Sequence, residues 1–161
     1  MMRRVATLAV ALCACSLAWA DTGLQTGAAT TLPQLPKGNY LSNYYIDVPA
    51  GMQQLGVNLN ASGGDVDMFV RYGSPFPVQN SSVSYPTVSY DLLSRYGHYH
   101  SVSSTSNESV LILPSDKVPL QAGRWYIALI NGGSSTANGT LTAAYSANAP
   151  AGSIVLDFNS S

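Results

Sequence analysis

The sequence predicts an all-β protein, a single-domain antiparallel β-sandwich of jelly-roll type. Two observations lead to this prediction. Short segments with apolar residues at every second position recur along the chain, which is the period of half-buried strands. Gly, Pro and Asn-Gly turns separate these segments, and the sequence shows no apolar stripe with the 3.6-residue period of a helix.

The expected strands follow one another along the chain at regular spacing. In 53–60, QQLGVNLN, the side chains of Leu55, Val57 and Leu59 share one face and polar side chains share the other. The segment 123–131, GRWYIALIN, is apolar on both faces, which predicts a central strand with Trp125 in the core. The residues between Ile130 and Leu141 are interpreted as a hairpin or loop connection. The remaining expected strands are 43–48 (NYYIDV), 66–72 (VDMFVRY), 108–114 (ESVLILP), 139–146 (GTLTAAYS) and 152–158 (GSIVLDF).

The first 20 residues are typical of an export signal. Two arginines precede an apolar run that ends near Leu17, and Ala18-Trp19-Ala20 matches the small-x-small pattern of a signal-peptidase site. The run is too short for a membrane span, which needs about 20 apolar residues. Cleavage would leave a secreted or periplasmic chain that begins at Asp21.

A lipoprotein signal is the alternative, with Cys15 as the lipidated residue and the only expected membrane attachment. A twin-arginine signal at Arg3 and Arg4 is a further, weaker interpretation of the same segment. Both cysteines of the chain lie before the expected cleavage site, so the exported protein is predicted to form no disulfide.

The charge of the exported chain excludes some partners. Eight acidic residues remain against five basic ones, because Arg3 and Arg4 are removed, and the net charge is therefore about −3. No basic patch is available to neutralise phosphates, so we expect neither nucleic-acid binding nor strong binding to anionic membranes.

Two further segments flank the predicted sandwich of residues 39–147, and a third, unusual one lies within it. Residues 21–38 are rich in Thr, Gly and Pro without periodicity and are interpreted as an N-terminal arm or linker. Residues 75–108 are polar and rich in Ser and Tyr, and are expected to be a functional loop or to contain short strands. The C-terminal residues 148–161 include the last expected strand.

Four stretches together resemble the bacterial pre-peptidase C-terminal domain. They are YYIDVPAGMQQLGVNL, GGDVDMFVRYGSPF, YDLLSRY followed by SNES, and LQAGRWYIALING, and the resemblance covers about residues 40–146. The resemblance implies a non-catalytic β-sandwich module, usually attached to secreted proteases and other exported hydrolases. Some relatives bind insoluble polymers such as collagen or chitin, and some bind calcium.

The chain departs from this family pattern at two places. Relatives often carry a cysteine after the Tyr-Asp pair and another after the Asn-Glu-Ser run, where this chain has Leu92 and Val110. We expect an apolar contact between Leu92 and Val110 in place of the disulfide. The chain also has an extra segment, GHYHSVSSTS at 97–106, between these anchors.

Asp65 and Asp67, which precede and enter an apolar strand, admit three interpretations. On a strand both side chains point to the same side, about 6.5–7 Å apart. Asp65 would cap the Gly63-Gly64 turn while Asp67 accepts backbone hydrogen bonds, or both would help to bind calcium, which takes six to eight oxygen ligands. As a glycosidase pair they are poorly placed, because two neighbours on one strand do not face each other across a sugar.

The sequence gives little support to an enzyme or to a transition-metal protein. His98 and His100 lack a nearby third ligand, so a solvated polar face is the simpler interpretation. The chain contains no G-x-S-x-G motif, and the exported part contains no cysteine. We expect a non-catalytic protein without a cofactor, calcium excepted.

The tyrosine-rich segment suggests how such a module would bind. Tyrosine offers rigid contact area and serine offers adaptable hydrogen bonds. We expect Tyr90, Arg95, Tyr96 and Tyr99 to contact an extracellular polysaccharide or protein polymer, or a partner protein. The alternative is a structural or processing module of a larger exported hydrolase, with no ligand of its own.

Overall fold

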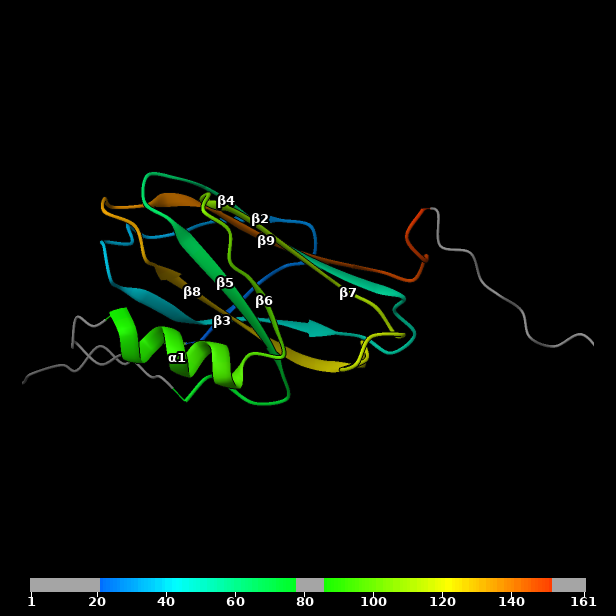
Figure 1. The fold of residues 1–161 in the computed structure, drawn as a ribbon. Coiled ribbons are helices and arrows are strands. Elements are labelled where there is room, and N and C mark those ends of the chain that lie inside the picture. Colours follow the sequence, from blue (N-terminus) through cyan, green and yellow to red (C-terminus); the bar gives the residue numbers. More distant parts are fainter. Residues whose placement is uncertain (1–20, 78–85, 152–161) are drawn as a thin grey trace, which may run out of the picture.

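Two β-sheets packed face to face form the body of the protein, as Figure 1 shows. The computed structural model describes residues 21–77 and 86–151. Sheet A has the strand order β1-β3-β8-β5-β6, and sheet B has the order β2-β9-β4-β7. The strand pairs of the described residues are antiparallel except for β1 with β3. The predicted all-β sandwich is confirmed.

Most expected strands form close to their predicted positions, and the segments 66–72 and 123–131 form with the predicted bounds. The expected strand 152–158 lies outside the described residues. Sheet A consists of β1 (Thr22–Gly23), β3 (Tyr40–Val48), β5 (Val66–Tyr72), β6 (Tyr99–Ser101) and β8 (Gly123–Asn131). Sheet B consists of β2 (Ala29–Thr31), β4 (Gln54–Ser62), β7 (Asn107–Ile112) and β9 (Asn138–Ser146).

The main core lies between the two sheets and follows from the two-residue period of the strands. Leu55, Val57 and Leu59 of β4 point inward from sheet B and are almost completely buried. Trp125 of β8 is fully buried opposite them, as predicted, and β8 is a central strand between β3 and β5. The connection after β8 crosses from sheet A to sheet B, so it is a loop between sheets and not a hairpin.

The N-terminal segment 21–38 is part of the sandwich, which corrects its interpretation as an arm or linker. Strand β1 pairs with β3 in sheet A, and β2 pairs with β9 in sheet B. Leu24, Leu32 and Leu35 from this segment are buried in the core. The strands are only two and three residues long, which is too short for a period-two pattern to be recognised in the sequence.

A helix occupies part of the segment 75–108, where the sequence predicted a loop or short strands. Helix α1 (Pro86–Tyr96) packs on the outer side of sheet A, away from sheet B (Figure 1). Proline suits the first helical position because its missing N–H has no partner there. The helix ends before Gly97, whose N–H donates to the Leu93 carbonyl at 2.8 Å. Strand β6 follows directly.

The position of α1 contradicts the expected contact between Leu92 and Val110. Leu92 lies on the helix outside sheet A, whereas Val110 of β7 points from sheet B into the space between the sheets. The helix instead uses the neighbouring Leu93, which is fully buried against the outer face of sheet A.

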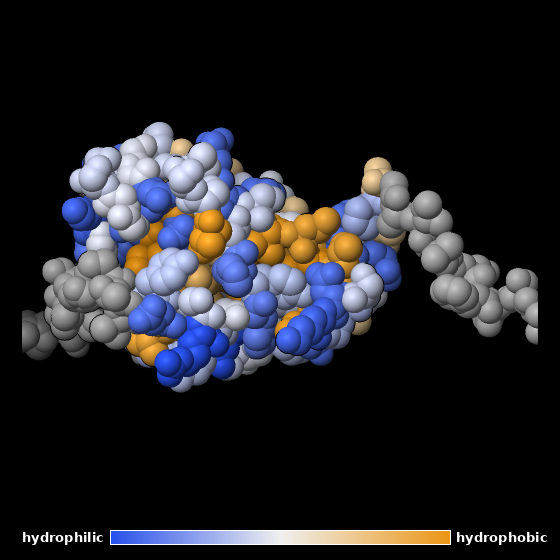
Figure 2. All heavy atoms as spheres, in the orientation of Figure 1, coloured by the Kyte–Doolittle hydropathy of each residue, from blue (hydrophilic) through white to orange (hydrophobic). Residues whose placement is uncertain are grey.

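One side of the molecule shows a band of apolar atoms over the edge strands β6 and β7 (Figure 2). Among the described residues, the exposed large apolar side chains include Val102, which follows β6, and Leu111 of β7, with exposed fractions of 44% and 49%. Within the described residues, no helix has the length and apolar character needed to cross a membrane.

Candidate functional site

The outer face of sheet A carries a second, aromatic cluster that positions the candidate site. Successive side chains of β5 and β8 point to opposite faces of sheet A. Phe69 and Tyr126 therefore point outward, while their neighbours in sequence point into the main core. Leu93 of α1 packs onto this outer face. The cluster is completed by Phe76, Ala128 and Ile130, with the half-buried Tyr40, Tyr45 and Tyr90 against it.

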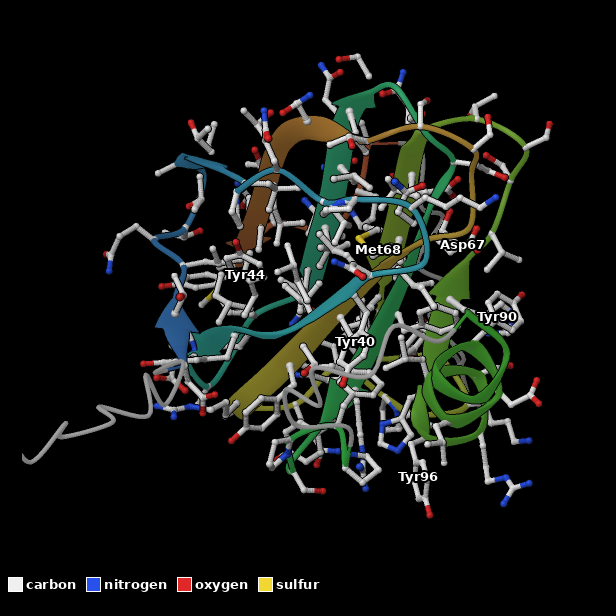
Figure 3. The ribbon with its side chains drawn as sticks, turned by 90° about the vertical axis from the view of Figure 1, so that its left-hand side faces the viewer. Tyr40, Tyr44, Asp67, Met68, Tyr90 and Tyr96 are labelled. Atoms are coloured by element: carbon white, nitrogen blue, oxygen red, sulfur yellow. The ribbon has the colours of Figure 1, made fainter. Side chains whose placement is uncertain are left out.

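Three of the four predicted binding residues lie on α1, but on different sides of it. The Tyr90 ring meets the Phe69 ring edge-on, with centroids 5.6 Å apart, and is half-buried. Tyr96 is 38% exposed and points away from the sandwich, whereas Tyr90 lies near Asp67 (Figure 3). Arg95 is exposed. Tyr90, Arg95 and Tyr96 are referred to below as the α1 surface.

Arg71 of β5 supports the exposed end of the α1 surface. Its guanidinium carbon lies 5.3 Å from the centre of the Tyr96 ring, a cation–π distance. One of its terminal nitrogens also donates to the Pro75 carbonyl at 2.9 Å. The hydrogen bond to Pro75 thus fixes the Arg71 guanidinium beside the Tyr96 ring, which stays partly exposed.

Tyr99, the fourth predicted binding residue, is not part of this surface. It lies in β6 with its ring 6.2 Å from that of Trp125, and its hydroxyl is within hydrogen-bond distance of the Val118 carbonyl and the Asp116 carboxylate. Burial, followed by the charge of Asp116 and the hydrogen bond to it, raises the pKa of Tyr99 to about 12. Its role is therefore to pin β6 to the loop before β8.

The two histidines each have a structural partner. His98 Nδ1 accepts a hydrogen bond from the Tyr72 N–H at 3.1 Å. Burial and then the positive charge of Arg71 lower the pKa of His98, which favours its neutral form. The His100 ring lies beside Phe69, with centroids 6.4 Å apart. In residues 21–77 and 86–151, no group of three or more His, Cys, Asp or Glu side chains is arranged to hold a metal ion.

Asp65 and Asp67 do not make the hydrogen bonds that their structural interpretation requires. The Gly64 N–H donates to Ser135 Oγ at 3.0 Å, so the predicted cap by Asp65 is replaced by a serine, and Asp65 Oδ1 is buried without a partner. Asp67 lies on the outer face of sheet A. Burial, then the charges of Asp65 and Glu108, raise its pKa to about 6, and no hydrogen bond contributes to this shift.

Asn131, which the sequence analysis did not single out, supplies the hydrogen bonds around the Asp65 turn. Its side chain is completely buried, and its Nδ2 donates to the carbonyls of Leu35 and Ser135, both at 2.8 Å. Its Oδ1 accepts from the N–H groups of Asp65 and Gly133 at 3.2 and 3.0 Å. The only sequence signal is its position at a strand end before two glycines.

Glu108, also missed, has the hydrogen-bonded environment that was expected for Asp67. It is 3% exposed and accepts from the Ser103 N–H at 3.1 Å and from Ser103 Oγ at 2.6 Å. Ser101 Oγ of β6 donates to its other oxygen. Glu108 therefore links the edge strand β6 of sheet A to the edge strand β7 of sheet B. The serines of 101–106 are the signal that could have suggested it.

The candidate site is thus the α1 surface. Of the carboxylates described above, Glu108 is buried, and the pKa of Asp67 is raised, which favours its neutral form. Comparison of the chain with models of known protein families gave no match, and comparison with curated proteins gave none. The resemblance to the pre-peptidase C-terminal domain therefore rests on the four sequence stretches alone.

Proposed function

We propose that the chain is an exported, non-catalytic accessory domain that binds an extracellular polymer or a partner protein through the α1 surface. The observation that carries this proposal is the placement of Tyr96. Its ring is held by Arg71 from the sheet below, yet 38% of the side chain is exposed. Ordering an aromatic side chain in advance lowers the entropy cost of binding.

The surroundings of Tyr96 support the same function. Arg95 is exposed next to it, and arginine and tyrosine are the residue types enriched among binding hot spots. The helix itself is fixed to sheet A by Leu93 and by the ring contact between Tyr90 and Phe69. A surface built on a fixed helix presents its side chains in one arrangement.

The test is a pull-down of the purified chain on insoluble collagen, chitin, cellulose and peptidoglycan. The double variant Arg95→Ala and Tyr96→Ala should lose binding while its melting temperature stays close to that of the wild type, because neither side chain is buried. Tyr99→Phe is the matched control: its hydroxyl is engaged inside the fold, so it should retain binding.

Two outcomes would contradict the proposal. Binding that survives the double variant would remove the α1 surface from the function. Failure to bind any of the four polymers would favour a structural or processing module within a larger exported hydrolase.

A further inference from the structure

The two outer faces of the sandwich differ in charge. On sheet A, charged side chains point outward from three strands, among them Asp47 of β3, Arg71 of β5 and Arg124 of β8. On sheet B, the outward positions of β2, β4, β7 and β9 carry no Asp, Glu, Lys, Arg or His. A sheet face without any charged side chain offers no ion pair to a charged ligand, which distinguishes it from the outer face of sheet A.

The pairing of the strands arranges the uncharged side chains of sheet B into rows. One row runs across three strands as Asn107, Asn60 and Thr140, and Thr31 of β2 extends it. The next row consists of Ser109, Asn58 and Thr142. Neighbours are about 4.8 Å apart across the strands and about 6.6–6.8 Å apart along them. These six side chains, Asn58, Asn60, Asn107, Ser109, Thr140 and Thr142, are called the amide-hydroxyl grid.

Internal hydrogen bonds fix two amides of the grid. Asn58 Oδ1 accepts from Ser109 Oγ at 2.8 Å, and Asn107 Oδ1 accepts from the Ala61 N–H at 3.1 Å. Both oxygens are therefore used within the protein, and the NH₂ groups of these exposed side chains remain to donate to a ligand. The Thr hydroxyls beside them donate or accept.

The third row is apolar and adjoins the grid directly. It consists of Leu111, Gly56 and Ala144, and Leu111 is 49% exposed. A face that combines amide and hydroxyl groups with a small apolar strip complements a sugar polymer, which has hydroxyl groups at its edges and C–H groups on its faces.

We infer that the outer face of sheet B binds an uncharged polysaccharide, through the amide-hydroxyl grid and the adjoining apolar row. The absence of cations disfavours polyanions, whose binding depends on Lys and Arg. The grid also lacks the aromatic, Met and Arg residues that are enriched in protein–protein interfaces. This inference rests on the proposed function in that both take the ligand to be an extracellular polymer, and it adds a second contact on the opposite face of the sandwich.

The test uses microcrystalline cellulose as the neutral probe and dextran sulfate as the charged one. The double variant Thr140→Val and Thr142→Val keeps β-branched side chains in the strand and removes two hydroxyls. We expect about tenfold weaker binding to cellulose, from the loss of two hydrogen bonds, with an unchanged melting temperature. Asn60→Lys should also weaken cellulose binding and should increase binding to dextran sulfate.

The α1-surface variant Arg95→Ala and Tyr96→Ala separates this inference from the proposed function. Loss of cellulose binding in the sheet B variants supports the inference, with or without loss in the α1 variant, whereas loss in the α1 variant alone overturns it and leaves the proposed function standing. Equal binding of cellulose and dextran sulfate by the wild type overturns the assigned chemistry. A wild-type dimer that both sheet B variants abolish, or the absence of cellulose binding, also overturns it.

Discussion

Asp67 and Glu108 are two carboxylates whose charges influence each other but whose hydrogen bonding differs. Glu108 is almost fully buried but accepts hydrogen bonds from Ser101 and Ser103. Asp67 is less buried, yet its pKa is raised because burial and nearby like charges have no hydrogen bond to offset them. The charge of Asp67 therefore opposes folding at neutral pH.

We predict that Asp67→Asn stabilises the protein at about pH 7.5. The folded-state pKa is raised from 3.8 to about 6, so the stability linked to this group is complete below pH 3.8 and is lost as the pH rises through about 6. The variant should gain about 1 kcal/mol in unfolding free energy at pH 7.5, less than the full shift because partial exposure screens the charge. The gain should vanish near pH 4. Urea denaturation at both pH values measures it.

Asp47→Asn is the matched control, because its shift has the opposite sign. A hydrogen bond from Arg124 lowers the pKa of Asp47, so this variant should lose a little stability at neutral pH. The loss is small because both side chains of the pair are exposed. An Asp67→Asn variant less stable than the wild type at pH 7.5 would refute the sign assigned to its charge.

At the scale of elements, the sequence predicts those parts whose apolar pattern is long enough to repeat. Strands β5 and β8 form as expected because apolar residues fill most positions over seven and nine residues. Strands β1 and β2 give none. Helix α1 is not predicted because Tyr90 and Leu93, which fix it to the sheet, have mostly polar neighbours in the sequence. The role of Asn131 could not be predicted either, because its hydrogen-bond partners include residues far away in the sequence.

The helix offers a paired test at consecutive residues. Leu93→Ala should lower the unfolding free energy by about 2–5 kcal/mol, because it leaves a cavity under α1 where Leu93 is fully buried. Leu92→Ala, on the half-buried side, should cost less than about 1 kcal/mol. Chemical denaturation of both variants measures the difference. Equal losses would show that α1 is not attached to sheet A through Leu93.

For the molecule as a whole, we predict the same melting temperature in calcium and in chelator. Calcium takes six to eight oxygen ligands, and Asp65 and Asp67 stand outside any three-residue group suited to a metal in the described residues. A ligand that bound only the folded state would raise the melting temperature. A rise in calcium that disappears in the double variant Asp65→Asn and Asp67→Asn would instead establish the calcium site considered from the sequence.

We predict that the N-terminal segment 21–38 unfolds together with the rest of the sandwich, as one cooperative unit. Leu35 is 3% exposed, and it forms an isolated bridge with Ala137 and accepts from Asn131 through its carbonyl. Leu35→Ala should therefore cost about 2–5 kcal/mol, whereas Leu111→Ala, at a position 49% exposed, should stay within about 0.5 kcal/mol of the wild type.

Far-UV circular dichroism and tryptophan fluorescence should report one coincident unfolding transition for both leucine variants. Fluorescence follows the core through Trp125 of β8, whereas circular dichroism follows the strands of both sheets. If residues 21–38 acted only as a linker, Leu35→Ala would be as mild as Leu111→Ala. A large loss with a single transition shows that residues 21–38 are required for the fold. Strands β1 and β2 each extend a different sheet, and the leucines that follow them, Leu24, Leu32 and Leu35, lie in the core between the sheets.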